Sequence, residues 1–278
     1  MKKILLILFS LSLLSLTTMS NAKSIRIGTE GAYPPWNNLN SAGELEGAEI
    51  DFGNEACSRM GVDCEWVTQD WDGIIPALLQ GKYDIIIAGM SITEERKEKV
   101  NFTNGYMTDG ARFAVMKGSG LEGLMVGSGV NKVNLNNAGG KEQAAIGQLI
   151  AAMNGSTVCV QSSTIHQNFL EKHMSGAVKV RLYQSVDDHN LDLRAGRCDA
   201  VLADVGSIID FMESGGGVNV AFTGPTFSGG VFGDGVGGAI RKEDGDILEM
   251  WNKVIAEMSA DGTTAEITKK WFGRDISM

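Results

Sequence analysis

Runs of apolar residues alternate along the chain with stretches in which apolar positions recur at helical spacing. A short strand is predicted at 25–28, and the next apolar positions recur at i, i+3, i+4 and i+7, on one helix face: Gly53, Ala56, Cys57 and Met60. A strand near 64–67 follows, then a helix that Asp72 is expected to cap. The unbroken apolar run at 85–88 is typical of a parallel strand covered on both faces. This order predicts an α/β domain.

A second copy of this module is indicated 115 residues further along. Seven positions match at that offset, one of them only conservatively: Gln69, Asp72, Leu78, Gly81, Lys82, Asp84 and Ala88 correspond to Gln184, Asp187, Leu193, Gly196, Arg197, Asp199 and Ala203. Between the modules, residues 118–140 are rich in Gly, Ser and Asn and show little periodicity, which predicts a surface insertion. We therefore expect two similar α/β lobes.

The end of the chain is predicted to return to the first lobe. After a second glycine-rich stretch at 224–238, a strand at 238–241 and an amphipathic helix around Trp251 form a tail too short to fold alone. The chain would then cross between the lobes near 108–112 and near 223–226, and these crossings would form a hinge. The expected division is a leader at 1–22, lobe 1 at 23–110 plus 225–278, and lobe 2 at 111–224.

The leader at 1–22 has the pattern of a cleaved secretory signal. Two lysines precede an apolar run at 4–16, and small residues at 20 and 22 precede the predicted cut. The run is shorter than the ~20 residues that a bilayer-spanning helix needs, so a membrane anchor is the weaker alternative. No cysteine lies near the cut, which argues against a lipid anchor. We expect the mature chain, from Lys23 onward, to be exported to the periplasm and soluble.

Composition narrows the range of partners. Charged residues make up 21% of the chain and apolar residues 43%, as in folded globular proteins. Without the two lysines of the leader, the formal net charge moves from −10 to −12, with 22 basic against 34 acidic residues. Nucleic acid is therefore not expected as a partner.

Four cysteines follow the leader. In an oxidising compartment Cys57 and Cys64, with six residues between them, are expected to form a disulfide rather than two free thiols. Cys159 and Cys198 would pair only if their strands are neighbours, which the sequence leaves open.

Candidate binding residues come from the carboxyl ends of the predicted strands, because ligands bind beyond that edge of an open parallel sheet. The strands and adjoining loops deliver to it Glu30, Tyr33, Trp71, Ala88, Gly89, Met90, Ser91 and Arg96 from the first lobe, and Gln161, Thr164, Ile165 and Asp204 from the second. The three histidines show no metal-ligand spacing, and the glycines at 233–238 precede a strand rather than the helix of a dinucleotide site. No metal or cofactor is expected.

Arg96 is informative because of its place. Residues 91–94 resemble a capping box, which puts Arg96 near the start of a helix, where the helix dipole opposes a cation by about 0.3–1 kcal/mol. An anionic ligand would explain such a residue. The alternative is a surface salt bridge to Glu94, Glu95 or Glu98.

The second lobe offers matching groups. A second capping pattern at 164–167 opens a helix after the strand at 158–160, and free N–H groups at such a helix start form an anion site. Arg96 and this helix start could hold one carboxylate, and Asp204 could accept an ammonium group. Together these groups predict a binding site for an α-amino acid.

Several stretches form a pattern that covers nearly all of the mature chain: 27–35, 71–78, 90–96, 199–204, 232–237, 261–263 and 271–273. They resemble the extracytoplasmic solute-binding proteins for polar and basic amino acids, which feed ABC importers. The similarity is strongest to the binders of arginine, lysine, ornithine and histidine and to their opine-binding relatives. The stretch with Thr93, Glu94 and Arg96 is the most specific part.

The resemblance implies a two-lobe periplasmic-binding-protein fold of type II, in which each lobe is a parallel-type sheet flanked by helices and a two-strand hinge joins them. It also implies delivery to an inner-membrane permease, a monomeric state, and the family's disulfide at Cys57 and Cys64. The implied ligand contacts are Arg96, Ser91 and the Thr164 helix start for the α-carboxylate, Asp204 for the α-ammonium, Tyr33 and Trp71 for stacking, and Glu30 for the distal cation.

The chain departs from the family's pattern at several of these positions. Glu30 stands where basic amino acid binders commonly have Asp, Ala88 and Gly89 replace serines, and Ile165 takes a place often held by Thr. Some opine binders lack an acid at the position of Asp204, so its presence favours a free α-amino group.

The leading hypothesis is binding of a cationic L-amino acid between two closing lobes, and the protein is not expected to be an enzyme. One alternative is an opine, such as octopine or nopaline, or another polar amino acid. A different class of function is a periplasmic cyclohexadienyl or arogenate dehydratase on the same fold, with Glu30 as its general acid.

Overall fold

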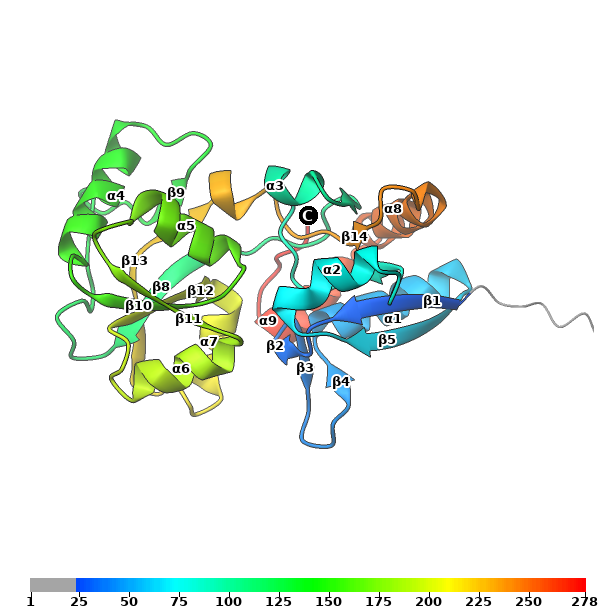
Figure 1. Cartoon of the computed structure of the whole chain (residues 1–278), viewed down its shortest axis with the longest axis horizontal. Helices are drawn as coiled ribbons and strands as arrows, with labels where there is room; N and C mark the ends of the chain where they lie inside the picture. Colours follow the sequence, from blue (N-terminus) through cyan, green and yellow to red (C-terminus); the bar gives the residue numbers. More distant parts are fainter. Residues whose placement is uncertain (1–23) are drawn as a thin grey trace, which may run out of the picture.

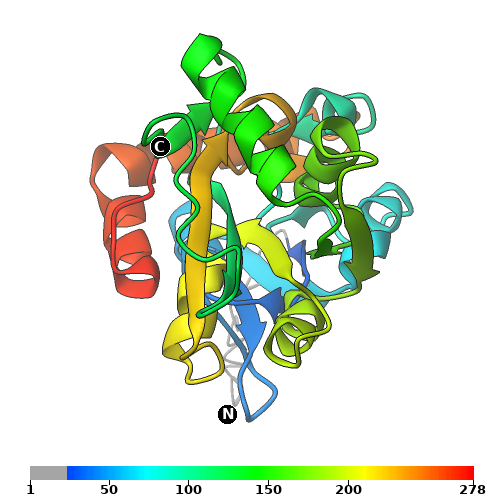
Figure 2. The same cartoon turned by 90° about the vertical axis from the view of Figure 1, so that its left-hand side faces the viewer.

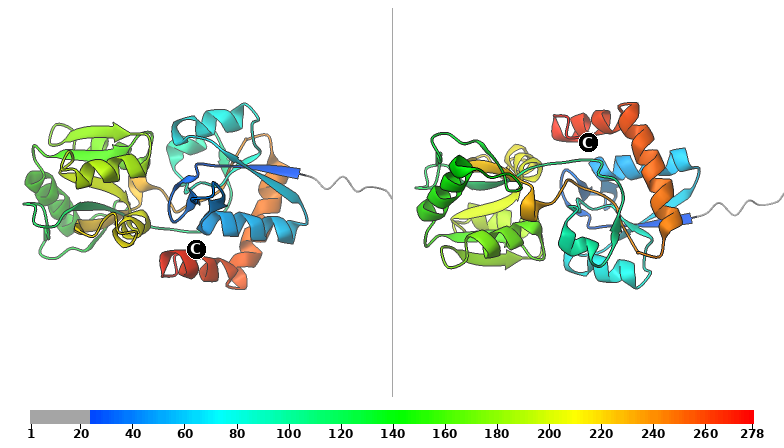
Figure 3. Two further views of the ribbon diagram at one scale, coloured as in Figure 1. Left: turned by 90° about the horizontal axis from the view of Figure 1, so that it is seen from below. Right: turned by 90° about the horizontal axis from the view of Figure 1, so that it is seen from above.

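Residues 24–278 of this computed structural model form two α/β lobes that lie side by side (Figure 1). The leader predicted at 1–22 lies outside the described residues. Views from below and from above show chain segments passing between the two lobes (Figure 3). Within residues 24–278, no helix is long and apolar enough to cross a membrane. The expected two-lobe architecture is confirmed.

The first lobe is built on a five-stranded mixed sheet in the order β5-β1-β6-β14-β7. The strands are β1 (Ser24–Thr29), β5 (Asp63–Thr68), β6 (Ile85–Ile86), β7 (Asn101–Phe102) and β14 (Ala239–Ile240). β1 pairs in parallel with β5 and β6, whereas β14 is antiparallel to β6 and β7. A small antiparallel sheet contains β2 (Ala32–Tyr33), β3 (Asn37–Leu39) and β4 (Leu45–Glu46). The strands that the apolar pattern predicts, β1, β5 and β6, are thus parallel, whereas the other part of the sheet is antiparallel.

Five α-helices belong to this lobe: α1 (Ala48–Met60), α2 (Ile74–Leu79), α3 (Glu94–Lys97), α8 (Gly245–Ala260) and α9 (Thr263–Phe272). The face predicted for α1 is confirmed, because Gly53, Ala56 and Cys57 are buried. α8 and α9 pack on α1, and Trp251 lies in the same hydrophobic core as Ile27. The C-terminal tail therefore returns to the first lobe, as predicted.

Two predicted helix starts were wrong. The chain enters α2 through a 3-10 turn (Trp71–Gly73), so Gly73 rather than Asp72 precedes the helix and no side chain caps it. Asp72 instead accepts a hydrogen bond from Ser162 Oγ of the second lobe at 2.8 Å. Thr93, and not Ser91, caps α3, because its Oγ1 accepts from the backbone N–H of Arg96 at 3.3 Å.

The second lobe contains a six-stranded mixed sheet in the order β11-β10-β12-β8-β13-β9. Its strands are β8 (Ala111–Met116), β9 (Lys132–Asn134), β10 (Thr157–Gln161), β11 (Lys179–Tyr183), β12 (Ala200–Asp204) and β13 (Val220–Ser228). Its helices are α4 (Gly140–Ala152), α5 (Ile165–His173), α6 (Val186–Arg194) and α7 (Val205–Glu213). Figure 2 faces this lobe, with β13 and α4 toward the viewer.

The internal repeat corresponds to a repeated strand order. β5-β1-β6 of the first sheet recurs as β11-β10-β12 in the second, with α6 as the counterpart of α2. The predicted surface insertion, however, contains the strand β9, which pairs in parallel with β13 and buries Val133. A three-residue strand with one buried side chain gives no periodic signal, so the sequence analysis missed it.

Two chain segments join the lobes. The first leads directly into β8, close to the crossing predicted at 108–112. The second crossing was predicted at 223–226, but these residues lie within β13 of the second lobe. Phe232 still lies in the core of the second lobe, whereas Val236 lies in the core of the first. The chain thus returns to the first lobe within 233–236. There the two segments pair with each other at Met107 and Val236.

Both pairs of cysteines form disulfides. The bridge predicted between Cys57 and Cys64 is confirmed and joins the end of α1 to β5, with a Cα–Cα distance of 6.2 Å. Cys159 and Cys198, which the sequence left open, also pair, at a Cα–Cα distance of 5.9 Å. They meet because β10 and β12 are adjacent parallel strands.

Candidate functional site

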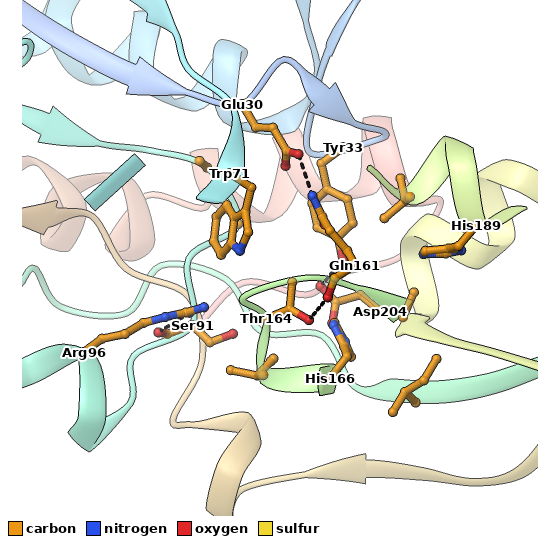
Figure 4. Close-up of a pocket in the computed structure, with 16 residues that line it drawn as sticks. Glu30, Tyr33, Trp71, Ser91, Arg96, Gln161, Thr164, His166, His189 and Asp204 are labelled. Atoms are coloured by element: carbon orange, nitrogen blue, oxygen red, sulfur yellow. Dashed lines mark hydrogen bonds and ion pairs between the residues drawn. The ribbon is translucent and has the colours of Figure 1, made fainter. Parts of the chain in front are cut away.

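A cavity between the two lobes brings together most of the candidate binding residues (Figure 4). Eleven of the twelve line it: Glu30, Tyr33, Trp71, Ala88, Gly89, Ser91 and Arg96 from the first lobe, and Gln161, Thr164, Ile165 and Asp204 from the second. The exception is Met90, whose side chain is fully buried in the core under α2. The carboxyl ends of the parallel strands of both lobes therefore face one cavity, as expected for ligand binding at that edge of an open sheet.

Glu30 lies where β1 ends, on the first-lobe side of the cavity. Its Oε1 accepts a hydrogen bond from Gln161 Nε2 of the second lobe at 2.6 Å. Burial raises the pKa of Glu30 to about 7; the hydrogen bond from Gln161 opposes this rise, and the charges of Asp70, Asp72 and Asp187 add to it. A carboxyl group in this state gains its charge readily when a cation arrives beside it.

Asp204 ends β12 and faces the cavity from the second lobe. Its Oδ2 accepts a hydrogen bond from the Tyr33 hydroxyl at 2.7 Å, which joins the two lobes, and its Oδ1 lies 3.2 Å from His166 Nε2. Only 8% of Asp204 is exposed. A carboxylate has about four lone-pair positions, so Asp204 keeps capacity to accept an ammonium group alongside these partners.

Arg96 and Trp71 form another wall of the cavity. The guanidinium carbon lies 5.2 Å from the centre of the Trp71 ring, and Arg96 Nη1 donates to the Ser91 carbonyl at 3.0 Å. Burial lowers the pKa of Arg96 to about 10, with Glu95 and Asp204 acting in the opposite direction, so the side chain stays charged at neutral pH. Its remaining N–H groups suit bidentate binding of a carboxylate. The salt bridge weighed as the alternative does not form among residues 24–278.

The start of α5 supplies backbone donors on the opposite side. Thr164 Oγ1 accepts from the Gln167 N–H at 3.3 Å, so the predicted cap is confirmed, whereas Gln167 Oε1 accepts from the N–H of Ser163 at 2.8 Å and not from that of Thr164. The N–H groups of Ile165 and His166 lie in the first helical turn, ahead of the intrahelical ladder. Such a helix start attracts an anion.

The backbone conformation and close packing favour glycine at position 89. Gly89 has φ +59°, and a Cβ there would lie 3.3 Å from the ring of Tyr33. The backbone of the 88–91 segment thereby comes close to the aromatic side chain that faces it.

Sequence reasoning missed five residues that line the cavity: His166, Val186, His189, Leu202 and Ala203. Signals for some of them were present, because Val186 stands 115 residues after Trp71 and corresponds to it in the repeat, and Leu202 and Ala203 directly precede Asp204. No pattern in the sequence indicated the two histidines.

His189 lies on α6 and is only 1% exposed. Neither of its ring nitrogens has a hydrogen-bond partner within bonding geometry among residues 24–278. Burial lowers its pKa to about 3, with His166 acting in the same direction and the neighbouring Asn190 opposing, so the ring is neutral at physiological pH. A neutral imidazole in this place offers one donor and one acceptor to a polar group in the cavity.

Hydrogen bonds also join the two lobes beside the cavity. Trp71 Nε1 donates to the Ser163 carbonyl at 3.0 Å, and Asn168 Nδ2 donates to Glu95 Oε2 at 3.1 Å. Within residues 24–278 no group of three or more His, Cys, Asp or Glu side chains could hold a metal ion. The charged and polar side chains of both lobes that line the cavity suit a small polar molecule with charged groups of its own.

Two hinged α/β lobes that enclose a cavity lined by charged groups of both define a two-lobed ligand-binding protein of the type II periplasmic-binding-protein class. The chain belongs to the bacterial extracellular solute-binding proteins, family 3, whose family model matches residues 25–274.

Individual relatives align over almost their whole length. The chain is 38% identical to the L-arginine-binding protein of Pseudomonas aeruginosa, over 99% of this chain and 98% of that protein. It is 37% identical to the octopine-binding periplasmic protein of Rhizobium meliloti, over 92% of each. A periplasmic His/Glu/Gln/Arg/opine family-binding protein from Silicibacter pomeroyi, solved in complex with lysine, superposes with a TM-score of 0.72 at 35% identity, covering 91% of this chain and 99% of that one.

Proposed function

We propose that the protein binds a cationic L-α-amino acid of the arginine, lysine or ornithine type between its lobes. The observation that carries this proposal is the distribution of charge in the cavity: a guanidinium from one lobe, Arg96, and a carboxylate from the other, Asp204, face the same space. A zwitterion placed between them would pair its carboxylate with Arg96 and its ammonium with Asp204. A second carboxyl group, Glu30, would receive a distal cation.

Binding at both lobes is what would couple the ligand to closure. Only a ligand that interacts more favourably with the closed arrangement shifts the population toward it. In the proposed pose, Arg96 and Glu30 act from the first lobe, and Asp204 and the Thr164 helix start act from the second. The names of the arginine-binding and lysine-bound relatives support the same ligand class.

Isothermal titration calorimetry of the mature chain with arginine, lysine, ornithine and histidine tests the proposal. We expect saturable binding of at least one of the first three. Heat with glutamate or a sugar, and none with any cationic amino acid, would refute the assignment.

An opine is the second candidate, because the cavity lining also includes groups that the proposed amino acid pose does not use. Val186, Leu202 and Ala203 are apolar, and His189 has unpartnered polar atoms. Octopine is an arginine whose α-nitrogen carries a short carboxylated substituent, and that substituent would need such additional contacts. A relative is named for octopine binding. Tighter binding of octopine than of arginine in the same titration would favour this candidate.

The family also supports a proposal for the cellular role. We infer that the leader directs export to the periplasm, and that the closed, ligand-bound monomer delivers its cargo to an inner-membrane ABC permease. The dehydratase alternative has less support, because both of the relatives named above are described as binding proteins.

A further inference from the structure

Behind the cavity wall lies a carboxylate that the proposed function does not use. Glu49, in the first turn of α1, is completely buried. Three neutral groups donate to its two oxygens: the Tyr106 hydroxyl at 2.6 Å, Asn37 Nδ2 at 2.9 Å, and the Gly89 N–H at 2.8 and 2.7 Å. Burial raises the pKa of Glu49, and these hydrogen bonds oppose the rise. A buried carboxylate is costly unless its lone pairs are satisfied, so the arrangement invites a reason for its presence.

Two of the donors connect Glu49 to the segments that line the cavity. Asn37 Oδ1 accepts from the N–H of Gly31, the residue that follows Glu30. Gly89 itself lines the cavity and packs against Tyr33. Through its bonds from Asn37 and Gly89, Glu49 connects the loop of Glu30, the proposed partner of the distal cation, with the 88–91 loop of the same cavity.

The third donor connects the same carboxylate to the hinge. The Tyr106 N–H donates to the Val236 carbonyl at 2.9 Å, and the Val236 N–H donates to the Met107 carbonyl at 2.8 Å. The two chain segments that cross between the lobes therefore pair directly beside Tyr106. Its ring stacks on Phe52 of α1, with centroids 4.5 Å apart, which fixes its hydroxyl toward Glu49.

We propose that Glu49 is a positioning residue for the ligand cavity: its carboxylate holds the Glu30 loop and the Gly89 loop in register with the hinge and so sets ligand affinity without touching the ligand. This inference rests on the proposed function for the identity of the ligand used to test it. Two acceptor oxygens in one rigid group are the property on which the role depends.

Glu49→Gln removes that property at nearly constant volume. The amide has one acceptor oxygen, and its NH₂ group would face an N–H donor of Asn37 or Gly89. Asn37 cannot rotate its amide to compensate without losing the bond from Gly31. Tyr106→Phe is the milder change, because it deletes a single donor and leaves the bonds to both loops in place.

Calorimetric titration with L-arginine separates positioning from mere stability. The variants are Glu49→Gln, Tyr106→Phe and, as a control for lost stability, Ile255→Ala, which truncates a buried side chain of α8 in the hydrophobic core that also contains Tyr106. All are measured well below their own Tm. We expect Glu49→Gln to raise Kd at least tenfold and Tyr106→Phe to raise it two- to fivefold, whereas Ile255→Ala stays within twofold of wild type. Equal Kd values for the three variants and wild type would overturn the proposal.

A double-mutant cycle asks whether Glu49 acts through the Glu30 loop. In a Glu30→Gln background, the further effect of Glu49→Gln on Kd should be clearly smaller than in wild type, because the receiver that it positions is gone. Full additivity would contradict the proposed route.

Amide hydrogen exchange tests the network without any ligand, so a failure of the proposed function is recognised separately. Wild type that binds no cationic amino acid would refute that function, and exchange would still decide on Glu49. We expect Glu49→Gln, or Tyr106→Phe if the first does not fold, to speed exchange at Gly31 and Gly89 relative to the amides of β1. Ile255→Ala should speed exchange evenly. Unchanged protection at both glycines would overturn the inference.

Discussion

Ligand affinity should depend on pH through Glu30. Burial raises its pKa to about 7 in the structure, so the free carboxyl group is neutral below that pH and charged above it. A cationic ligand group beside it lowers the pKa, typically by 1–3 units, because the charged form is stabilised. Binding therefore releases a proton below pH 7. Ligand affinity should therefore be highest above about pH 8 and fall as the pH decreases through 7.

The size of the effect follows from the same pKa. At pH 6, one unit below the pKa, about nine-tenths of the free molecules carry a protonated Glu30, and binding must remove that proton. We expect Kd for arginine to rise about tenfold between pH 8 and pH 6. Arginine itself keeps its charges over this range. Titrations in two buffers of different ionisation enthalpy would report the released proton directly.

Glu30→Gln is the matched control for this prediction. The variant keeps a side chain of the same length but has no titrating carboxyl, so it should bind weakly and lose most of the pH dependence between 6 and 8. His166 also faces the cavity, beside Asp204, and a slope that persists in Glu30→Gln would assign the effect to another group. A flat Kd in wild type over this range would refute the reasoning.

Three further predictions concern the charged receivers and the second disulfide. Arg96→Lys keeps the charge but loses the planar fork, and calorimetry should show affinity for arginine falling about 10–100-fold, while an unchanged Kd would remove Arg96 from the site. Asp204→Asn should raise Kd for arginine about 30-fold or more, and an unchanged Kd would argue against ammonium binding there. Replacing Cys159 and Cys198 by Ala should lower the free energy of unfolding in urea by about 4 kcal/mol, against about 2.5 for the other bridge, because the loop it closes spans 39 residues rather than 7.

Much of the first lobe could be predicted because its signals are local. The apolar run at 85–88 and the spacing of Ala56 and Cys57 depend only on which faces are buried, and the structure buries them. The repeat extended this prediction to the second lobe. Strand ends then indicated where side chains converge, which is why eleven of the twelve candidates line one cavity.

The errors arise where the outcome depends on a distant partner. Asp is a residue type that often caps helices, yet Asp72 lies in the 3-10 turn before α2 and accepts a hydrogen bond from Ser162 in the other lobe. The second bridge required the order of β10 and β12, which no local pattern encodes. His189 and Glu49 are visible only after folding, because their importance lies in buried polar atoms whose partners, or lack of them, come from other segments.

The most direct test of the account compares L-arginine with two analogues that each lack one end of the zwitterion: agmatine, without the carboxylate, and 5-guanidinopentanoic acid, without the α-amine. Calorimetry of the mature chain at pH 7.5 should show binding of arginine and at least a hundredfold weaker binding of each analogue, because Arg96 or Asp204 would be left unpaired in the closed cavity. If either analogue binds as tightly as arginine, the ligand is not held at both ends by the two lobes, and the central claim is contradicted.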